Sequence, residues 1–146
     1  MSDYQHVLLA IDFSEQSLYI ADKAKSLADK YQAKLSIIHV LDNIPMPDTN
    51  YGMVIPLDQA FGDGLLNAEK EKLIRIADYV AVALENRWLI WGVPKQEIIN
   101  IALQESVDLI VVGSHGRHGL ALLLGSTANS ILHHTKCDVI AIRLQD

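Results

Sequence analysis

Short, continuously apolar runs alternate along this chain with longer segments in which apolar residues recur at helical spacing. A short apolar run between turn residues is typical of a strand buried on both faces, as in a parallel sheet. The pattern predicts five such strands, at 6–11, 34–40, 88–91, 109–112 and 137–143.

In most of the intervals between these runs, apolar residues recur with the period of a helix. It predicts helices over about 15–31 and 63–86, a third around Ile98–Ala102, and a last one from about Gly125 to His134. The interval 41–61 has no period and holds three of the four prolines. A loop of this length in a compact domain is expected to be a lid or binding loop, or to be disordered.

The order of these elements predicts one α/β domain over residues 1–146, with a parallel sheet and helices on both faces. Right-handed crossovers leave a point in such a sheet where the winding reverses, and ligands bind there, outside the carboxyl ends of the strands. We expect the first and fourth strands to be neighbours at that point. Asp12 and Gly113, which end these strands, should therefore border one crevice.

A glycine-rich segment, GSHGRHGLALLLGST at 113–127, follows the fourth apolar run. Glycines let the backbone pass close to a ligand and leave N–H groups free. The helix that begins at Gly125–Ser126 aims its unpaired N–H groups and the positive end of its dipole at the same space. These features predict an anion site, with phosphate as the expected anion. The segment matches neither the Walker A loop nor the dinucleotide fingerprint.

The distribution of charge leaves two interpretations of this segment open. The net charge is −6, which argues against general nucleic-acid binding. Between Asp108 and Asp138 there is no acidic residue, while Arg117, Lys136 and four of the six histidines lie there. An acid-free window suits an anionic ligand. A buried strand and helix would lack acidic residues without any ligand.

Other features of the composition favour a cytoplasmic protein without membrane insertion. No apolar run reaches the roughly 20 residues that span a bilayer, and no signal peptide is visible. The single Cys137 cannot form an internal disulfide, which fits a reducing compartment.

Asp12 is the candidate carboxylate of the crevice. It could bind a ribose hydroxyl or a Mg²⁺ ion that bridges phosphates. An aspartate before a helix is equally a good cap, and it is the second strand-end motif that favours ligand contact. His39, in a buried strand, is interpreted as a core histidine. The remaining histidines and Cys137 do not form the converging set of three or four ligands that zinc requires.

With these motifs the chain resembles the universal stress protein A family over essentially its whole length. The resemblance is carried by HVLLAIDFS at 6–14, IIHV at 37–40, DLIVVGSHG at 108–116 and LGST at 124–127. It implies a five-stranded fold of the adenine-nucleotide α-hydrolase type, with strand order 3-2-1-4-5 and dimers joined through the last strand.

Nucleotide-binding members of that family carry the pattern Gly-x2-Gly-x9-Gly-[Ser/Thr], and members without it do not bind ATP. Gly113, Gly116, Gly125 and Ser126 match this pattern in type. Eight residues separate Gly116 from Gly125, so the loop is one residue shorter than the family pattern. Gly119 lies inside this shorter loop.

The resemblance implies an adenine nucleotide as ligand (ATP, ADP or AMP), with Mg²⁺ as an optional companion at Asp12. Asp12 and Val40 would contact the nucleoside, with Val40 against adenine, and the two glycine-rich stretches would hold the phosphates. The expected contact residues are Ala10, Ile11, Asp12, Val40, Val112, Gly113, His115, Gly116, Arg117, Gly125, Ser126 and Thr127.

Three functional hypotheses follow. The leading one is a cytoplasmic, homodimeric ATP-binding stress protein that acts as a sensor or regulator with little or no hydrolysis, because the sequence offers no convincing base to activate water. The second is a slow ATPase or nucleotide-transferring enzyme with His115 as the base. The third is a dimer that binds no nucleotide and works through contacts with an unidentified protein partner. The glycines argue against this third hypothesis.

Overall fold

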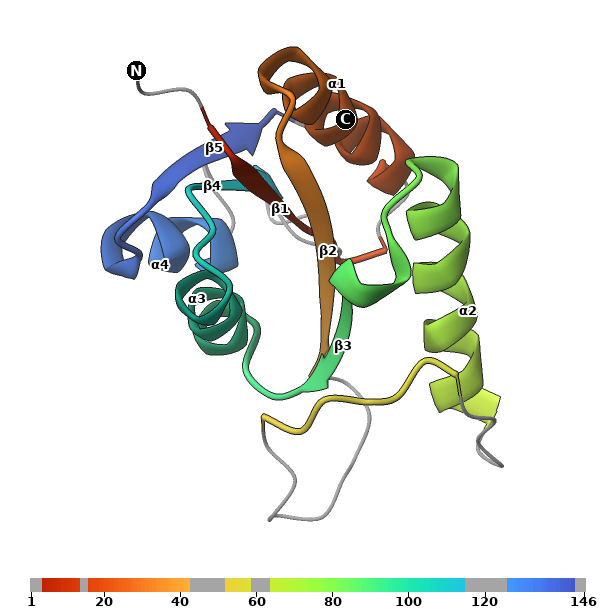
Figure 1. Cartoon of the computed structure of the whole chain (residues 1–146). Coiled ribbons are helices and arrows are strands. Elements are labelled where there is room, and N and C mark those ends of the chain that lie inside the picture. Colours follow the sequence, from red (N-terminus) through yellow and green to blue (C-terminus); the bar gives the residue numbers. More distant parts are fainter. Residues whose placement is uncertain (1–3, 14–15, 43–51, 59–63, 115–125, 144–146) are drawn as a thin grey trace.

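Five parallel strands form the centre of the molecule (Figure 1). The computed structural model describes residues 4–13, 16–42, 52–58, 64–114 and 126–143, and leaves the side chains of 126–128 undescribed. The strands are β1 (His6–Ala10), β2 (Lys34–Leu41), β3 (Arg87–Trp91), β4 (Leu109–Gly113) and β5 (Asp138–Ile142). Their order is β3-β2-β1-β4-β5, which confirms the predicted sheet.

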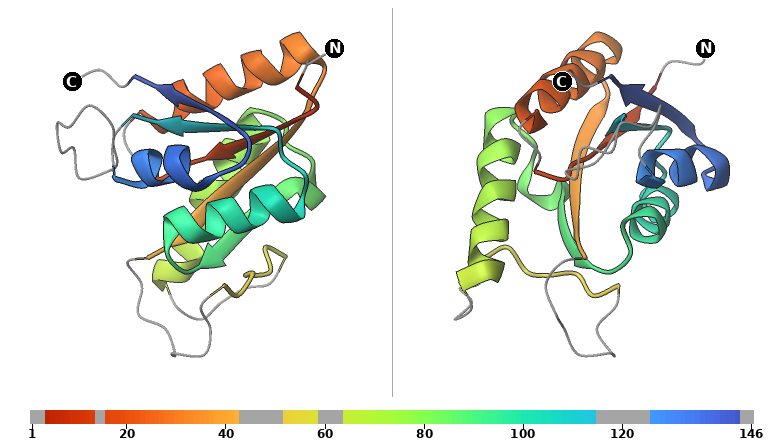
Figure 2. Two further views of the ribbon diagram at one scale, coloured as in Figure 1. Left: turned by 90° about the vertical axis from the view of Figure 1, so that its left-hand side faces the viewer. Right: turned by 180° about the vertical axis from the view of Figure 1, so that it is seen from behind.

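Helices cover both faces of this sheet, as predicted. They are α1 (Ser17–Tyr31), α2 (Gly64–Tyr79), α3 (Pro94–Gln104) and α4 (Ser126–His134). Figures 1 and 2 show α1 and α2 on one face and α3 and α4 on the other. Within the described residues, no helix combines the length and apolar character that crossing a membrane requires.

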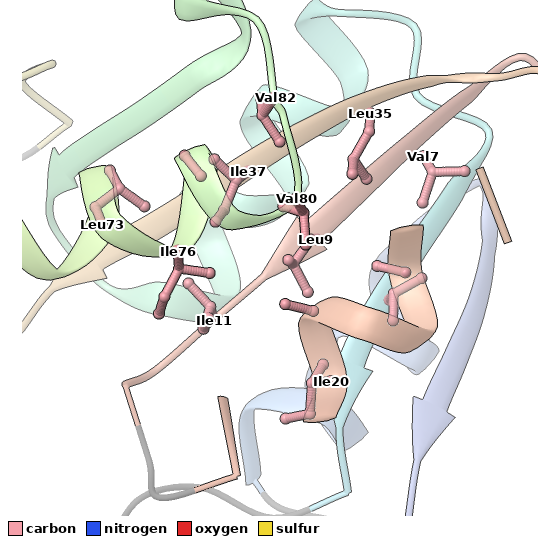
Figure 3. Packing of buried hydrophobic residues seen from close by; sticks show 14 of the residues in the cluster. Val7, Leu9, Ile11, Ile20, Leu35, Ile37, Leu73, Ile76, Val80 and Val82 are labelled. Carbon is pink, nitrogen blue, oxygen red and sulfur yellow. The ribbon is translucent and has the colours of Figure 1, made fainter. Parts of the chain in front are cut away.

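Alternate residues of β1 supply two separate cores because successive side chains of a strand point to opposite faces. Leu9 packs on the face of α1 and α2, in a cluster that includes Ile20 and Leu73 (Figure 3). Leu8 packs on the opposite face, in a cluster that includes Ile101 of α3 and Ile131 of α4. The central strands are therefore fixed from both sides, and their carboxyl ends form a rigid edge.

The helix predicted over 63–86 is wrong at its carboxyl end, because α2 stops at Tyr79. Ala81 adopts a left-handed conformation with φ 58°, and the Val82 N–H donates to the Ala77 carbonyl at 2.9 Å. The Arg87 guanidinium then donates to the Val82 carbonyl at 3.0 and 2.7 Å, which ties this turn to β3. Apolar spacing persists past the turn, and it therefore concealed the break.

Part of the interval 41–61 pairs with the edge of the sheet. The Gly52 N–H donates to the Trp91 carbonyl at 2.7 Å, and the Ile55 N–H donates to the Leu89 carbonyl at 2.7 Å. The bridge between Val54 and Ile90 is antiparallel. Residues 52–55 therefore cover the outer edge of β3; most of the expected loop, including 43–51, lies outside the described residues.

A buried histidine joins three elements at the amino ends of the strands. His6 Nδ1 donates to the Glu105 carbonyl at 3.0 Å, which leaves Nε2 to accept from Ser36 Oγ at 2.6 Å. The His6 N–H donates to Asp108 at 3.0 Å. Burial lowers the pKa of His6 from 6.5, while its hydrogen bond to Glu105 acts in the opposite direction. Folding therefore favours the neutral form of this ring.

Because of this ring, the stability of the fold should decrease as the pH is lowered. The pKa of His6 is lower in the folded chain, so below about pH 6.5 the unfolded chain binds more protons. The free energy of unfolding is then expected to decrease from pH 7.5 to pH 5. In His6→Gln this decrease should be smaller, as urea denaturation across that range would measure. His133→Gln, at an exposed position, should behave as the parent does; equal pH slopes in the parent and His6→Gln would contradict the assignment.

Candidate functional site

The winding of the chain reverses between β1 and β4. These strands are hydrogen-bonded neighbours, with Leu9 in register with Val111, as the sequence predicted. The chain leaves β1 toward α1 on one face and leaves β4 toward α4 on the other (Figure 2). The two connections diverge, and ligands in open α/β sheets bind at such a point, outside the carboxyl ends of the strands. We refer to this predicted site as the crevice.

The structure brings six of the predicted site residues to this edge. Ala10, Ile11, Val40 and Val112 are buried at or just past the ends of β1, β2 and β4. Asp12 follows β1 and is partly exposed, and Gly113 is the last residue of β4. Ala10, Val40 and Val112 pack on the face of α3 and α4, whereas Ile11 packs on the opposite face.

The other predicted residues are described less completely. Ser126 and Thr127 are the first two residues of α4, and the structure describes their backbone only. The remaining four, His115, Gly116, Arg117 and Gly125, lie outside the described residues.

Asp12 does not act as the cap of α1. That helix begins at Ser17, and its N-cap residue is Gln16. Four residues separate Asp12 from the first helical turn, so the capping alternative for this carboxylate is wrong. The ligand-contact alternative stays a prediction.

The backbone of Val40 faces the crevice. The N–H and C=O of one strand residue point to the same neighbour, and those of the next residue point to the opposite one. The Ile38 carbonyl accepts from the Ile11 N–H, toward β1, and the Leu41 carbonyl accepts from the Gly92 N–H, toward β3. Val40 therefore directs its N–H and C=O to the side of β1, beyond the point where β1 has ended.

His39 and Phe13 pack together beside this edge, a contact that the sequence analysis missed. His39 is 2% exposed, as expected of a core histidine, and its Nδ1 lies 2.7 Å from the Ile11 carbonyl oxygen. Phe13 has a left-handed backbone, with φ 61°, and its ring centroid lies 4.0 Å from that of His39. The amine of Lys72 lies 5.8 Å above the Phe13 ring. Only the positions of His39 before Val40 and of Phe13 after Asp12 hinted at this arrangement.

Within the described part of the chain, no three His, Cys, Asp or Glu side chains gather closely enough to hold a metal ion. Asp12 alone fits Mg²⁺ only together with phosphates, since that ion is commonly bound through one or two carboxylates plus substrate oxygens. Cys137 is half-buried, with its Sγ 3.2 Å from Thr135 Oγ1. Burial raises the pKa of its thiol. Its environment is that of a packed thiol, without the lowered pKa of a reactive one.

A cavity of about 590 Å³ lies elsewhere, between α3 and the segment that covers β3. Val54, Ile90, Ile101, Glu97 and Asn100 are among the residues that line it. None of the predicted site residues lines it, so it is separate from the crevice between β1 and β4.

Comparison with known sequences identifies one family and several relatives that match nearly the whole chain. The sequence model of the Universal stress protein family matches residues 3–143. Universal stress protein A homolog 1 of Coxiella burnetii is 37% identical over 145 residues, which cover 98% of this chain and 99% of the relative. Universal stress protein YxiE of Bacillus subtilis is 31% identical over 147 residues, which cover 96% and 99%.

Solved structures share the fold. Hypothetical protein MJ0577, whose biochemical function was assigned from its structure, superposes with a TM-score of 0.75 at 22% identity, over 99% of both chains. A universal stress protein in complex with cAMP gives a TM-score of 0.67 at 25% identity, over 97% of this chain and 98% of that one. UspA from Lactobacillus plantarum gives 0.67 at 24% identity, over 98% and 100%.

Proposed function

Because this chain belongs to the universal stress protein family, we propose that it binds an adenine nucleotide in the crevice between the ends of β1 and β4. ATP is the proposed ligand, and the protein acts as a cytoplasmic sensor or regulator. The single observation that carries the proposal is the backbone of Val40, which directs one donor and one acceptor into the crevice from a buried strand end.

The Watson–Crick edge of adenine is complementary to that backbone. Its N1 accepts a hydrogen bond and its 6-amino group donates one. The Val40 N–H and C=O can satisfy both at once, and a rigid strand end gives them a fixed spacing. The buried side chains of Ala10 and Val112, which share the face of α3 and α4 with Val40, would supply an apolar surface for a flat base. A solved relative in complex with cAMP supports an adenine ligand for this chain.

Ribose and phosphates would follow along the edge from β2 toward α4. Asp12, past the end of β1, would accept from a ribose hydroxyl. Gly113 and the amino end of α4, at Ser126 and Thr127, would meet the phosphates, because unpaired N–H groups and the helix dipole favour anions there. We assign the same role to His115, Gly116, Arg117 and Gly125 on sequence grounds. Mg²⁺, where present, would join Asp12 to the phosphates.

Hydrolysis should be slow or absent. Fast phosphoryl transfer needs positioning of the nucleophile as well as stabilisation of charge. The crevice edge supplies backbone donors and one carboxylate, and His115 is the one candidate base that the sequence names. A slow ATPase is therefore the alternative function, with His115 in that role.

A homodimer through β5 completes the proposal. β5 is the terminal strand of the sheet, and its outer edge is unpaired in the single chain that the structure describes. Val139, Ile140 and Ile142 are only partly covered. An open edge of this kind favours pairing with a second copy. A monomer at micromolar concentration would contradict this part of the proposal.

Isothermal titration of the purified protein with ATP tests the nucleotide site. We expect saturable binding, and at least a tenfold loss of affinity in Asp12→Ala, which corresponds to about 1.4 kcal/mol. Asp29→Ala is the matched control, because Asp29 lies on α1 in an exposed pair with Lys25 at 3.2 Å. If the folded parent protein binds none of ATP, ADP, AMP and cAMP, the proposal is overturned. That result would favour the dimer that works without a nucleotide.

A further inference from the structure

We propose that His39 is a positioning residue that keeps the Val40 N–H free to read the nucleotide base. The proposal rests on the function proposed above and goes beyond it, because His39 does not itself face the crevice. Its side chain lies on the face of α1 and α2, where it has the same parity as Ile37 and Leu41. It acts through the main chain of β1.

The first step concerns the hydrogen bond that is replaced. In a regular parallel ladder, a residue that donates to Ile38 would accept from Val40. The Ile11 N–H does donate to the Ile38 carbonyl, at 3.0 Å. Between these described residues, however, no backbone bond joins the Val40 N–H to the Ile11 carbonyl. His39 Nδ1 occupies that carbonyl at 2.7 Å. Because a carbonyl only accepts, the proton is on Nδ1 and the ring is the donor.

The second step concerns the path of the chain after Ile11. A left-handed backbone costs a non-glycine residue about 1–2 kcal/mol, so the turn at Phe13 needs support. The His39 ring supplies it, since the two rings are 4.0 Å apart and inclined by 36°. One side chain thus holds the Ile11 carbonyl and carries the aromatic ring that follows Asp12. Strain of this kind persists only where the surroundings determine it, and it is concentrated at functional sites.

The consequence of losing His39 follows directly. The Ile11 carbonyl would become available to Val40, and the β1–β2 ladder could extend by one hydrogen bond. The Val40 N–H would then be unavailable to N1 of adenine, while the Val40 carbonyl could still accept from the amino group. Recognition of the base should weaken more than recognition of ribose and phosphate.

Hydrogen exchange tests the first step without any nucleotide. In His39→Leu the Val40 amide should become protected by at least tenfold relative to the parent. In His39→Asn it should exchange as in the parent, because Asn Nδ2 can donate from nearly the position of His Nδ1. The Ile38 amide serves as the internal control. Equal Val40 exchange in the parent and His39→Leu would overturn the proposal.

Titration with ATP and ITP tests the consequence for recognition of the base. Hypoxanthine has N1–H and a 6-carbonyl, so donor and acceptor are reversed and the parent should prefer ATP. The ratio of the two affinities should fall at least fivefold in His39→Leu and be retained in His39→Asn, a change that general destabilisation would not cause. An unchanged ratio in folded His39→Leu would overturn the positioning role. A parent that binds no nucleotide would instead overturn the proposed function, and the exchange experiment alone would then decide the role of His39.

Discussion

Placing a carboxylate at the first residue of α4, with Ser126→Asp, is expected to lower the affinity for ATP at least a hundredfold. Unit charges 4 Å apart interact by about 4 kcal/mol at an effective dielectric constant of 20, and ATP carries several negative charges. The new carboxylate would also compete for the N–H groups at the amino end of the helix. The fold should not suffer, because an acidic residue at this end stabilises a helix. Calorimetric titration together with urea denaturation measures both effects.

Ser130→Asp is the matched control, because it adds the same charge about one turn further along the helix. Its affinity for ATP should stay within a few-fold of the parent at physiological salt, where charges are screened over about 8 Å. If Ser126→Asp is folded and binds ATP as the parent does, the phosphates do not lie at α4.

The second large effect concerns stability. Leu9→Ala should lower the free energy of unfolding by about 2–5 kcal/mol, because it removes buried methyl groups and leaves a cavity. Leu9 is fully buried on the central strand, under α1 and α2 (Figure 3). Its neighbours are held by a sheet that is packed from both faces and can collapse little. Equilibrium urea denaturation of the parent and the variant measures the difference.

Leu84→Ala is the comparison for this change. Leu84 is 77% exposed in the turn after α2, and surface substitutions usually change stability by no more than about 0.5 kcal/mol. Leu84 falls within the helix that the spacing predicted over 63–86. A large loss in Leu84→Ala together with a small one in Leu9→Ala would mean that the core is elsewhere.

The sheet was predictable from sequence because its central strands, β1, β2 and β4, are buried on both faces. Continuous apolar runs such as Leu109–Val112 have few other structural solutions, and right-handed connections then restrict their order. The end of α2 was not predictable in this way. The break at Ala81 is stabilised by Arg87, a residue outside the helix, and by the Val82 carbonyl that it holds. Such a contact leaves no mark on the periodicity of the helix itself.

The candidate site was likewise predictable only in part. Topology was enough to bring Asp12 and Gly113 to neighbouring strand ends. Val40 came from family resemblance alone, since nothing in its sequence reveals where its backbone points. The pairing of its N–H depends on where the β1–β2 ladder ends, and in our proposal the bond from His39 to Ile11 sets that point. A histidine in an apolar run is correctly assigned to the core, and the assignment conceals what the core histidine does to its neighbour.

The segment 52–55 has a consequence for assembly. A parallel sheet has two lateral edges, and each can add a further strand. Here the chain blocks one of them itself, with a short antiparallel stretch of its own beside β3, and short edge strands are poor templates. In the terms of polymer chemistry the described molecule is monofunctional, with β5 as its one reactive end. Two copies joined there consume both ends, so growth through sheet edges terminates at a pair and cannot propagate into a fibre.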